Sequence, residues 1–493
     1  MSAVRPDAEA DDVLAGTDVG GRVVRGGAVR GLGYVAGNVF SAAASVLLLR
    51  YLGPGEFGRY VTVTAVVAIV GGITDAGLTA TGARELSVLP KGPARRRLTA
   101  DVAGIRIVLT AIGVAVGTAF SLVAGYGSAL VVGTVLMGAG LLLTNAQSAM
   151  LLPLSVELRN ERVTANEVAR QVLTVAGIAV LVVAGTGLVP FFAVQIAVGA
   201  VVLLASPLLL GRGGFIVPQF HWARWKPVIR ETLPLAVAVV LSVLYFRVLV
   251  VMMSLLTDDV QTGIFGTAYR IFEILVGLPI LLNTVVLPVV SAAPAADRAR
   301  YVLQRMVEVG ATIGAGIAVV VAVAAVPIVL ALGGPEYREA ARPLAILSFA
   351  LVFVFLNQAF NVSLIARRRQ RRIAVAGVIG LAVVVVGGLV LIPPLDAEGA
   401  AIAALLGEIA LCVATYTGLR GTLEGDLDAR FALRLLAALV PAAACLAPVG
   451  PALVRAPLAA LLFAVAVWRL GLIPGEVSDQ VAALVRRRRG GDA

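Results

Sequence analysis

The chain has 493 residues, of which 59% are hydrophobic and only 14% are charged, and its formal net charge is +11. Soluble domains carry about 25% charged residues, so this composition excludes an ordinary soluble enzyme. Its long apolar runs also exclude an outer-membrane barrel, whose strands alternate apolar and polar residues. The composition predicts an all-α polytopic membrane protein.

About fourteen apolar runs are long enough to be transmembrane helices, because one crossing takes about 20 residues. Six runs precede a polar break and eight follow it, and two pairs are separated only by short Gly/Pro turns. The runs are 29–50, 57–80, 102–124, 128–152, 168–186, 188–211, 231–255, 263–290, 304–331, 342–366, 373–393, 399–420, 432–448 and 451–472.

The polar break predicts two bundles of six helices, with two further helices at the end. An even number of helices in each half means that both halves enter from the same side, so we expect a pseudo-two-fold axis along the membrane normal. The predicted boundaries are 1–26 for a disordered cytosolic tail, 27–211 for the N-terminal bundle, 212–230 for a linker, 231–420 for the C-terminal bundle, 421–473 for helices 13 and 14, and 474–493 for a basic cytosolic tail.

The basic residues predict the orientation of the chain. With both termini placed inside, most of the 40 Lys and Arg residues fall in inner segments, as the positive-inside rule requires. We therefore predict a multi-pass protein of a bacterial-type cytoplasmic membrane and no nucleic-acid partner.

Residues 212–230 interleave aromatic and basic side chains and are expected to lie on anionic lipid, although a solvated loop is an alternative. The basic tail is either a short amphipathic helix on the same lipid or a frayed end.

Cysteine and histidine are too scarce for metal or disulfide chemistry. Cys412 and Cys445 lie within apolar runs, and His221 is the one histidine. A zinc site needs three or four ligands. We predict no cofactor, apart from a coupling cation such as H⁺ or Na⁺.

Three ionisable residues within the runs are predicted to share one depth in the membrane. Arg247 lies in the seventh run, and Arg270 and Glu273 lie in the eighth, which is its antiparallel neighbour. Charged groups in lipid are costly and face a cavity or a partner. They either neutralise one another or form a cationic wall for a pyrophosphate, whose oxygens suit the guanidinium fork. Two arginines against one glutamate leave a net positive charge, which favours the binding of a pyrophosphate over self-neutralisation.

Other polar residues in the runs are candidates for the transport path. Glu408 is either a protonatable coupling group or part of a structural hydrogen bond. Asp75 is expected to form a salt bridge with Arg84 at the inner rim. Amides in lipid line a path for sugars or tie helices together; the candidates are Asn38, Asn145, Asn357 and Asn361.

An ordered set of short motifs resembles the polysaccharide (oligosaccharide) flippase family of the MOP superfamily. The resemblance covers roughly residues 25–420 and implies two six-helix bundles that face each other in a V. Leu249 occupies a position where many family members have an acidic residue. The resemblance therefore does not imply that this chain couples transport to a cation through that position. The motifs are LGPGEFGRY at 52–60, DAGL at 75–78, RETLP at 230–234, LYFRV at 244–248, AYRIFE at 268–273, LPVVS at 287–291 and GPEY at 334–337.

The resulting hypothesis is a flippase for a polyprenyl-pyrophosphate-linked oligosaccharide in surface polysaccharide assembly, working by alternating access. Its expected partners are the lipid-linked oligosaccharide, anionic lipids and a polysaccharide polymerase or export machinery. A cation-coupled multidrug antiporter and a lipid II flippase of the same superfamily are alternatives. A membrane glycosyltransferase or polymerase is an alternative of another class, but it needs a large outer loop, and the predicted loops are short. A membrane scaffold that binds a partner through its tail is a further alternative.

Overall fold

The computed structural model describes residues 19–75, 77–157, 159–211, 216–291, 296–419, 429–447 and 452–472. Within these ranges the regular elements are all helices, which confirms the predicted fold class. The predicted disordered start of the chain at residues 1–18 and the basic tail beyond residue 472 lie outside the described residues.

The first bundle extends from α1 to α7, and the second extends from α8 to α12. The first contains α1 (Val19–Asp75), α2 (Leu78–Val88), α3 (Pro93–Val123), α4 (Ser128–Met150), α5 (Leu152–Val156), α6 (Asn160–Val183) and α7 (Leu188–Leu210). The second contains α8 (Trp222–Leu256), α9 (Asp259–Ser291), α10 (Ala296–Gly333), the 3-10 helix η2 (Pro335–Ala340), α11 (Ala341–Ala366) and α12 (Gln370–Leu419). The chain continues with α13 (Ala429–Ala443), η3 (Ala444–Leu446) and α14 (Ala452–Arg469).

Two helices each contain a pair of the predicted spans, joined across a kink. In α1 the kink is at Gly53, whose φ of 68° is easily adopted only by glycine. In α12 it is at Asp396, with φ of 48°, just after Pro393 and Pro394. In the described part of the chain, nine helices are long and apolar enough to cross a membrane, and both kinked helices are among them.

Several helices begin earlier than hydropathy predicts. α3 begins at Pro93 instead of 102, and α6 begins at Asn160 instead of 168. α8 begins at Trp222, inside the segment predicted as a linker. The added turns are rich in charged residues, so a search for apolar runs leaves them out although they continue the same helices.

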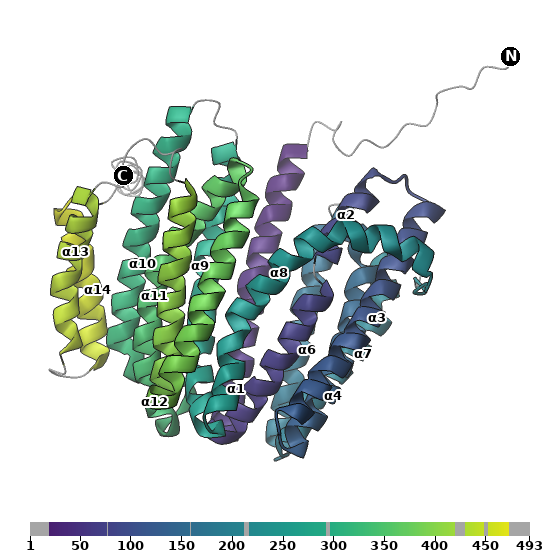
Figure 1. Ribbon diagram of the computed structural model, residues 1–493, viewed down its shortest axis with the longest axis horizontal. Coiled ribbons are helices and arrows are strands. Elements are labelled where there is room, and N and C mark those ends of the chain that lie inside the picture. The colour runs from purple at the N-terminus through teal and green to yellow at the C-terminus, as the bar shows by residue number, and fades with distance from the viewer. Residues whose placement is uncertain are drawn as a thin grey trace, which may run out of the picture.

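The two bundles form a V with α1 and α8 between them (Figure 1). Helices α3, α4, α6 and α7 lie on one side, α9 to α12 lie on the other, and α13 and α14 flank α10 at the outer edge. The bundles diverge toward the end that carries α2 and the first turns of α8 (Figure 1). We call this end the basic face, because Lys91 lies in the α2–α3 connection there and Arg95 to Arg97 follow in the first turn of α3.

At the opposite face the two bundles are held together by side chains at their helix ends. The guanidinium Nε of Arg59 on α1 donates to Asp259 Oδ2 at the start of α9, at 2.7 Å. The hydroxyl of Tyr337 in η2 donates to the backbone oxygen of Leu49 at 3.1 Å. The structure is therefore closed at this face and splayed at the basic face.

We expect the basic face to be cytoplasmic, as the arginine pattern predicts. Single cysteines placed at 91–97 or 367–372 should react with an impermeant thiol reagent only in inside-out vesicles. Cysteines at 258–259 or 396–398 should react in intact cells. Labelling of 367–372 from the cell exterior would contradict both the orientation and the number of spans.

Candidate transport cavity

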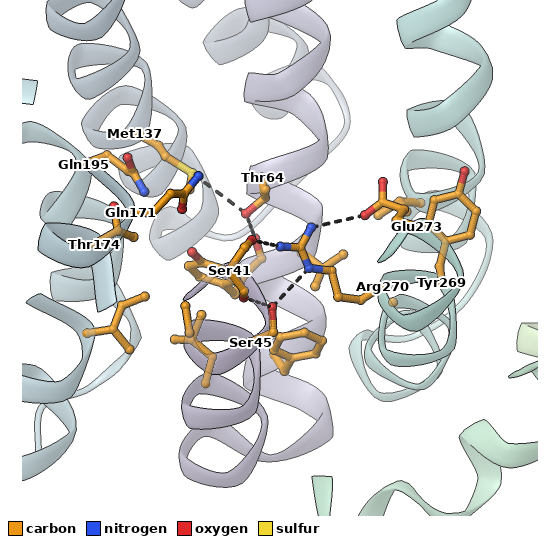
Figure 2. A pocket seen from close by; sticks show the side chains of 18 of the residues that line it. Ser41, Ser45, Thr64, Met137, Gln171, Thr174, Gln195, Tyr269, Arg270 and Glu273 are labelled. Carbon is orange, nitrogen blue, oxygen red and sulfur yellow. Dashed lines mark hydrogen bonds and ion pairs between the residues drawn. The ribbon is translucent and has the colours of Figure 1, made fainter. Parts of the chain in front are cut away.

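A cavity of about 240 Å³ lies between the two bundles. Helices α1, α4, α6 and α7 form one side of it, and α8 and α9 form the other. Figure 2 shows that polar side chains from several of these helices point into the same space. Its polar and charged lining comprises Ser41, Ser45, Thr64, Arg170, Gln171, Thr174, Gln195, Arg247, Arg270 and Glu273.

The three charged residues expected at one depth lie together in this cavity. Arg247 Nη1 is 2.8 Å from Glu273 Oε1, and Arg270 Nη1 is 3.3 Å from Glu273 Oε2. One carboxylate is therefore shared between two guanidinium groups. The Glu273 side chain is only 16% exposed, whereas those of Arg247 and Arg270 are 26% and 33% exposed. The arginines consequently retain surface that a bound anion can contact.

Arg270 also connects the two bundles. It extends from α9 toward α1, where its Nε donates to Ser45 Oγ at 3.1 Å and its Nη2 donates to Ser41 Oγ. Figure 2 shows Arg270 between these serines and Glu273. A change in its partners would thus affect the contact between the bundles as well as the charge in the cavity.

Sequence reasoning missed a third cavity arginine, Arg170. It lies only two residues into the apolar run that begins at 168, so hydropathy alone puts it at the edge of a span. Since α6 begins at Asn160, Arg170 lies well inside the helix and pairs with Glu167 one turn earlier. Gln171, Thr174 and Ile178 follow at helical spacing and line the same cavity; this periodicity is the signal that identifies the face.

The cavity has a clear excess of positive charge. Among the described lining residues, three arginines accompany one carboxylate. Arginine presents several N–H donors in a planar fork that matches phosphate and carboxylate oxygens. Hydroxyl and amide groups surround them, and these are the groups that bind sugar hydroxyls. The arrangement is suited to a substrate with an anionic group beside a polar one.

A second cavity, of about 380 Å³, lies next to the first in the direction of the basic face. It is lined by Ala68 and Gly72, which follow the first cavity along α1, and by Phe246 on α8. Arg247 and Glu273 line both cavities. This ion pair therefore separates the central cavity from a space nearer the basic face.

Asp75 has a different partner from the one we predicted. It pairs with Arg106 of α3, whereas Arg84 pairs with Glu231 of α8. The Arg106 side chain is 4% exposed and also donates to Ser148 Oγ at 2.6 Å. Arg106 lies within the apolar run at 102–124, in the middle of α3, so its buried guanidinium group needs a partner inside the bundle. The predicted Asp75–Arg84 pair is wrong, and the Asp75–Arg106 pair ties α1 to α3.

The predicted amides do not line the central cavity of the described structure. Asn145 donates from Nδ2 to Thr110 Oγ1 at 3.0 Å and to Thr74 Oγ1 at 3.3 Å, so it ties α4 to α3 and α1. Asn38, Asn357 and Asn361 are likewise outside its lining.

Glu408 lies within the C-terminal bundle and does not line the central cavity. It is 4% exposed. The Tyr245 hydroxyl and the Asn357 side chain lie beside its carboxyl group, and Asn357 Oδ1 accepts a hydrogen bond from Thr415 at 2.7 Å. Three helices thus meet around one buried carboxyl group. Its role in ion coupling stays a prediction.

A two-bundle membrane fold with a charged cavity at its centre is the architecture of a transporter. A profile of the polysaccharide biosynthesis protein family matches residues 23–293, and a MatE profile matches residues 234–390. Since the first covers more than half of the chain, the protein belongs to the polysaccharide biosynthesis protein family, among the flippases and transporters of the MOP superfamily.

Solved structures share the fold at low sequence identity. A lipid II flippase MurJ in an inward closed conformation is 12% identical, with a TM-score of 0.73 over 89% of this chain and 99% of that one. An inward-facing multidrug resistance MATE family transporter is 14% identical, with a TM-score of 0.62 over 78% and 94%. A mutant of the Vibrio cholerae MATE transporter VcmN is 13% identical, with a TM-score of 0.53 over 83% and 98%. No curated protein sequence matches the chain.

Proposed function

We propose that this protein flips a polyprenyl-pyrophosphate-linked oligosaccharide across the cytoplasmic membrane for surface polysaccharide assembly. The observation that carries the proposal is the central cavity, where three arginines accompany one carboxylate among hydroxyl and amide side chains. A pyrophosphate cannot cross about 30 Å of hydrocarbon without compensation of its charge. The cavity supplies that compensation between two bundles, and the family match supports a substrate from polysaccharide synthesis.

The pyrophosphate enters from the basic face, through the space that Arg247 and Glu273 share with the central cavity. It then replaces Glu273 as the partner of Arg247 and Arg270, since its oxygens offer the same bidentate acceptors. The sugars occupy the polar side of the cavity near Gln171 and Gln195. The polyprenyl chain stays in lipid. Rocking of the bundles about Arg270 and its α1 serines then opens the opposite face.

The charge of the cavity argues against a multidrug antiporter with cationic substrates. Such a substrate would be repelled by Arg247 and Arg270, whose two charges outnumber the single charge of their shared partner Glu273. Arg170 is paired with Glu167 and does not change this balance. A lipid II flippase is the second candidate, because a MurJ structure matches nearly the whole chain. Lipid II also carries a pyrophosphate on a polyprenyl chain, so the two candidates differ in the sugar and not in the arginine chemistry.

The purified protein in proteoliposomes should translocate a fluorescent polyprenyl-pyrophosphate oligosaccharide faster than protein-free vesicles. The signal is loss of accessibility of the sugar to an external degrading enzyme or quencher. Lipid II and a lipophilic drug cation are assayed in the same vesicles. Faster transport of lipid II than of the oligosaccharide would shift the assignment to a lipid II flippase, and transport of the cation alone would overturn it.

A further inference from the structure

A separate basic pocket of about 530 Å³ lies at the basic face of the N-terminal bundle. It is formed by the α2–α3 connection, the start of α3, α5, the start of α6 and the end of α7. Among the described residues that line it, Glu157 is the single carboxylate. Five basic side chains from two separate segments converge there: Lys91, Arg95, Arg96, Arg159 and Arg162.

The N-terminus of α3 adds a further positive contribution to this pocket. The helix begins at Pro93 after Gly92, and no side chain caps its first turn. The first amide N–H groups of a helix lack partners within the helix and carry partial positive charge. α3 is 31 residues long. An uncapped helix start beside several basic side chains is a favourable place for a phosphate.

Arg95 has a donor that its protein neighbours do not use. Its Nη2 donates to the backbone oxygen of Leu89 at 3.0 Å, and its Nη1 is 3.6 Å from Glu157 Oε1. Its Nε is buried and has no hydrogen-bond partner in the described structure. An unsatisfied buried donor is costly, and a turn of the guanidinium group toward a bound anion would give this donor an acceptor.

An apolar stripe on α7 leads to the same pocket. Leu204 and Leu208 are 76% and 84% exposed, and Gly211, one turn further along this face, lines the pocket. Exposed leucines on a transmembrane helix face lipid chains. The pocket therefore lies where a lipid whose acyl chains contact α7 would place its phosphate. A free phosphate ion would not require this stripe.

We propose that this pocket binds the phosphate group of an anionic phospholipid in the leaflet at the basic face. Basic pockets at the inner ends of transmembrane helices suit such headgroups. The positive-inside rule accounts for arginines anywhere on this face, but it does not require an uncapped helix start, a spare buried N–H and an apolar stripe to meet at one place. The proposal is independent of the transported substrate.

Native mass spectrometry of the full-length protein, purified with added phosphatidylglycerol or phosphatidylcholine, tests this site. The variant Lys91→Gln/Arg96→Gln removes two exposed charges from the pocket. The matched control, Arg371→Gln/Arg372→Gln, removes two exposed charges from the first turn of α12 on the same face. We expect the pocket variant to lose phosphatidylglycerol retention about tenfold or more, the control to match the wild type, and phosphatidylcholine to be retained poorly by all three.

Three results would overturn the proposal. Equal losses in the pocket and control variants would mean diffuse electrostatic attraction. Equal retention of the two lipids would mean that the phosphate charge is not recognised. Stabilisation by inorganic phosphate, with no additional effect of phosphatidylglycerol on the melting temperature, would assign the pocket to a free ion. If the double variant does not fold, the single change Arg96→Gln should still lower retention, and unchanged retention would count against the site.

Discussion

Arg247→Ala is expected to reduce translocation of the lipid-linked oligosaccharide about tenfold to a hundredfold while leaving the protein folded. A charge-assisted hydrogen bond contributes about 1.5–3 kcal/mol, and each 1.4 kcal/mol is a factor of about ten. In the structure, Glu273 keeps Arg270 as a partner when Arg247 is removed, so no lone carboxylate is left buried. The initial rate of flipping and the melting temperature are measured on the same preparations.

Two comparisons separate substrate binding from structural support. Arg247→Lys should recover only part of the rate, because lysine keeps the charge without the bidentate fork. Arg342→Ala is the matched control: Arg342 pairs with Glu398 at the opposite face, and its side chain is 82% exposed. The control should flip at the wild-type rate. If Arg270→Met/Glu273→Met is stable and flips normally, the role proposed for Arg270 is wrong.

The layout of the spans could be predicted because it depends on local composition. Among the described residues, most of each apolar run is helical, and even the two kinks fall between predicted spans, at Gly53 and Asp396. The grouping of Arg247, Arg270 and Glu273 was also predictable, since charged residues in lipid must find partners and the two helices are sequence neighbours. These inferences required no information on how distant helices pack.

Features that depend on packing between distant helices could not be predicted in this way. The partner of Asp75 is Arg106 and not Arg84, because α1 packs against α3 and brings these two side chains together. Arg170 reaches the cavity because α6 packs against α1. Both arginines lie within predicted apolar runs, at 102–124 and 168–186. Hydropathy places them in helices, but it does not say which neighbouring helix each side chain faces.

The closed opposite face depends on two glycines that bring α1 and α9 into backbone contact. A Cβ at Gly58 would overlap the backbone oxygen of Asp259, and one at Gly263 would overlap that of Pro54. Backbone atoms cannot move aside as side chains do, so a methyl group there must separate the helices. The Arg59–Asp259 ion pair lies at the same junction, so the distance between its two side chains would increase as the helices separate.

Gly58→Ala is therefore expected to open the opposite face and to slow transport, since alternating access needs a state that is sealed there. The reporter is a cysteine at Thr174, which lines the central cavity, in a protein without Cys412 and Cys445. Its labelling by an impermeant reagent from the predicted outer side should rise several-fold. Gly55→Ala is the matched control, because a Cβ there lies 3.7 Å from Val260 Cγ2, an ordinary contact. If Gly58→Ala does not fold, Gly266→Ala, which only crowds the Val61 side chain, should show a smaller increase in labelling. If Gly58→Ala is labelled and flips its substrate at the same rates as Gly55→Ala, this glycine contact does not seal the cavity.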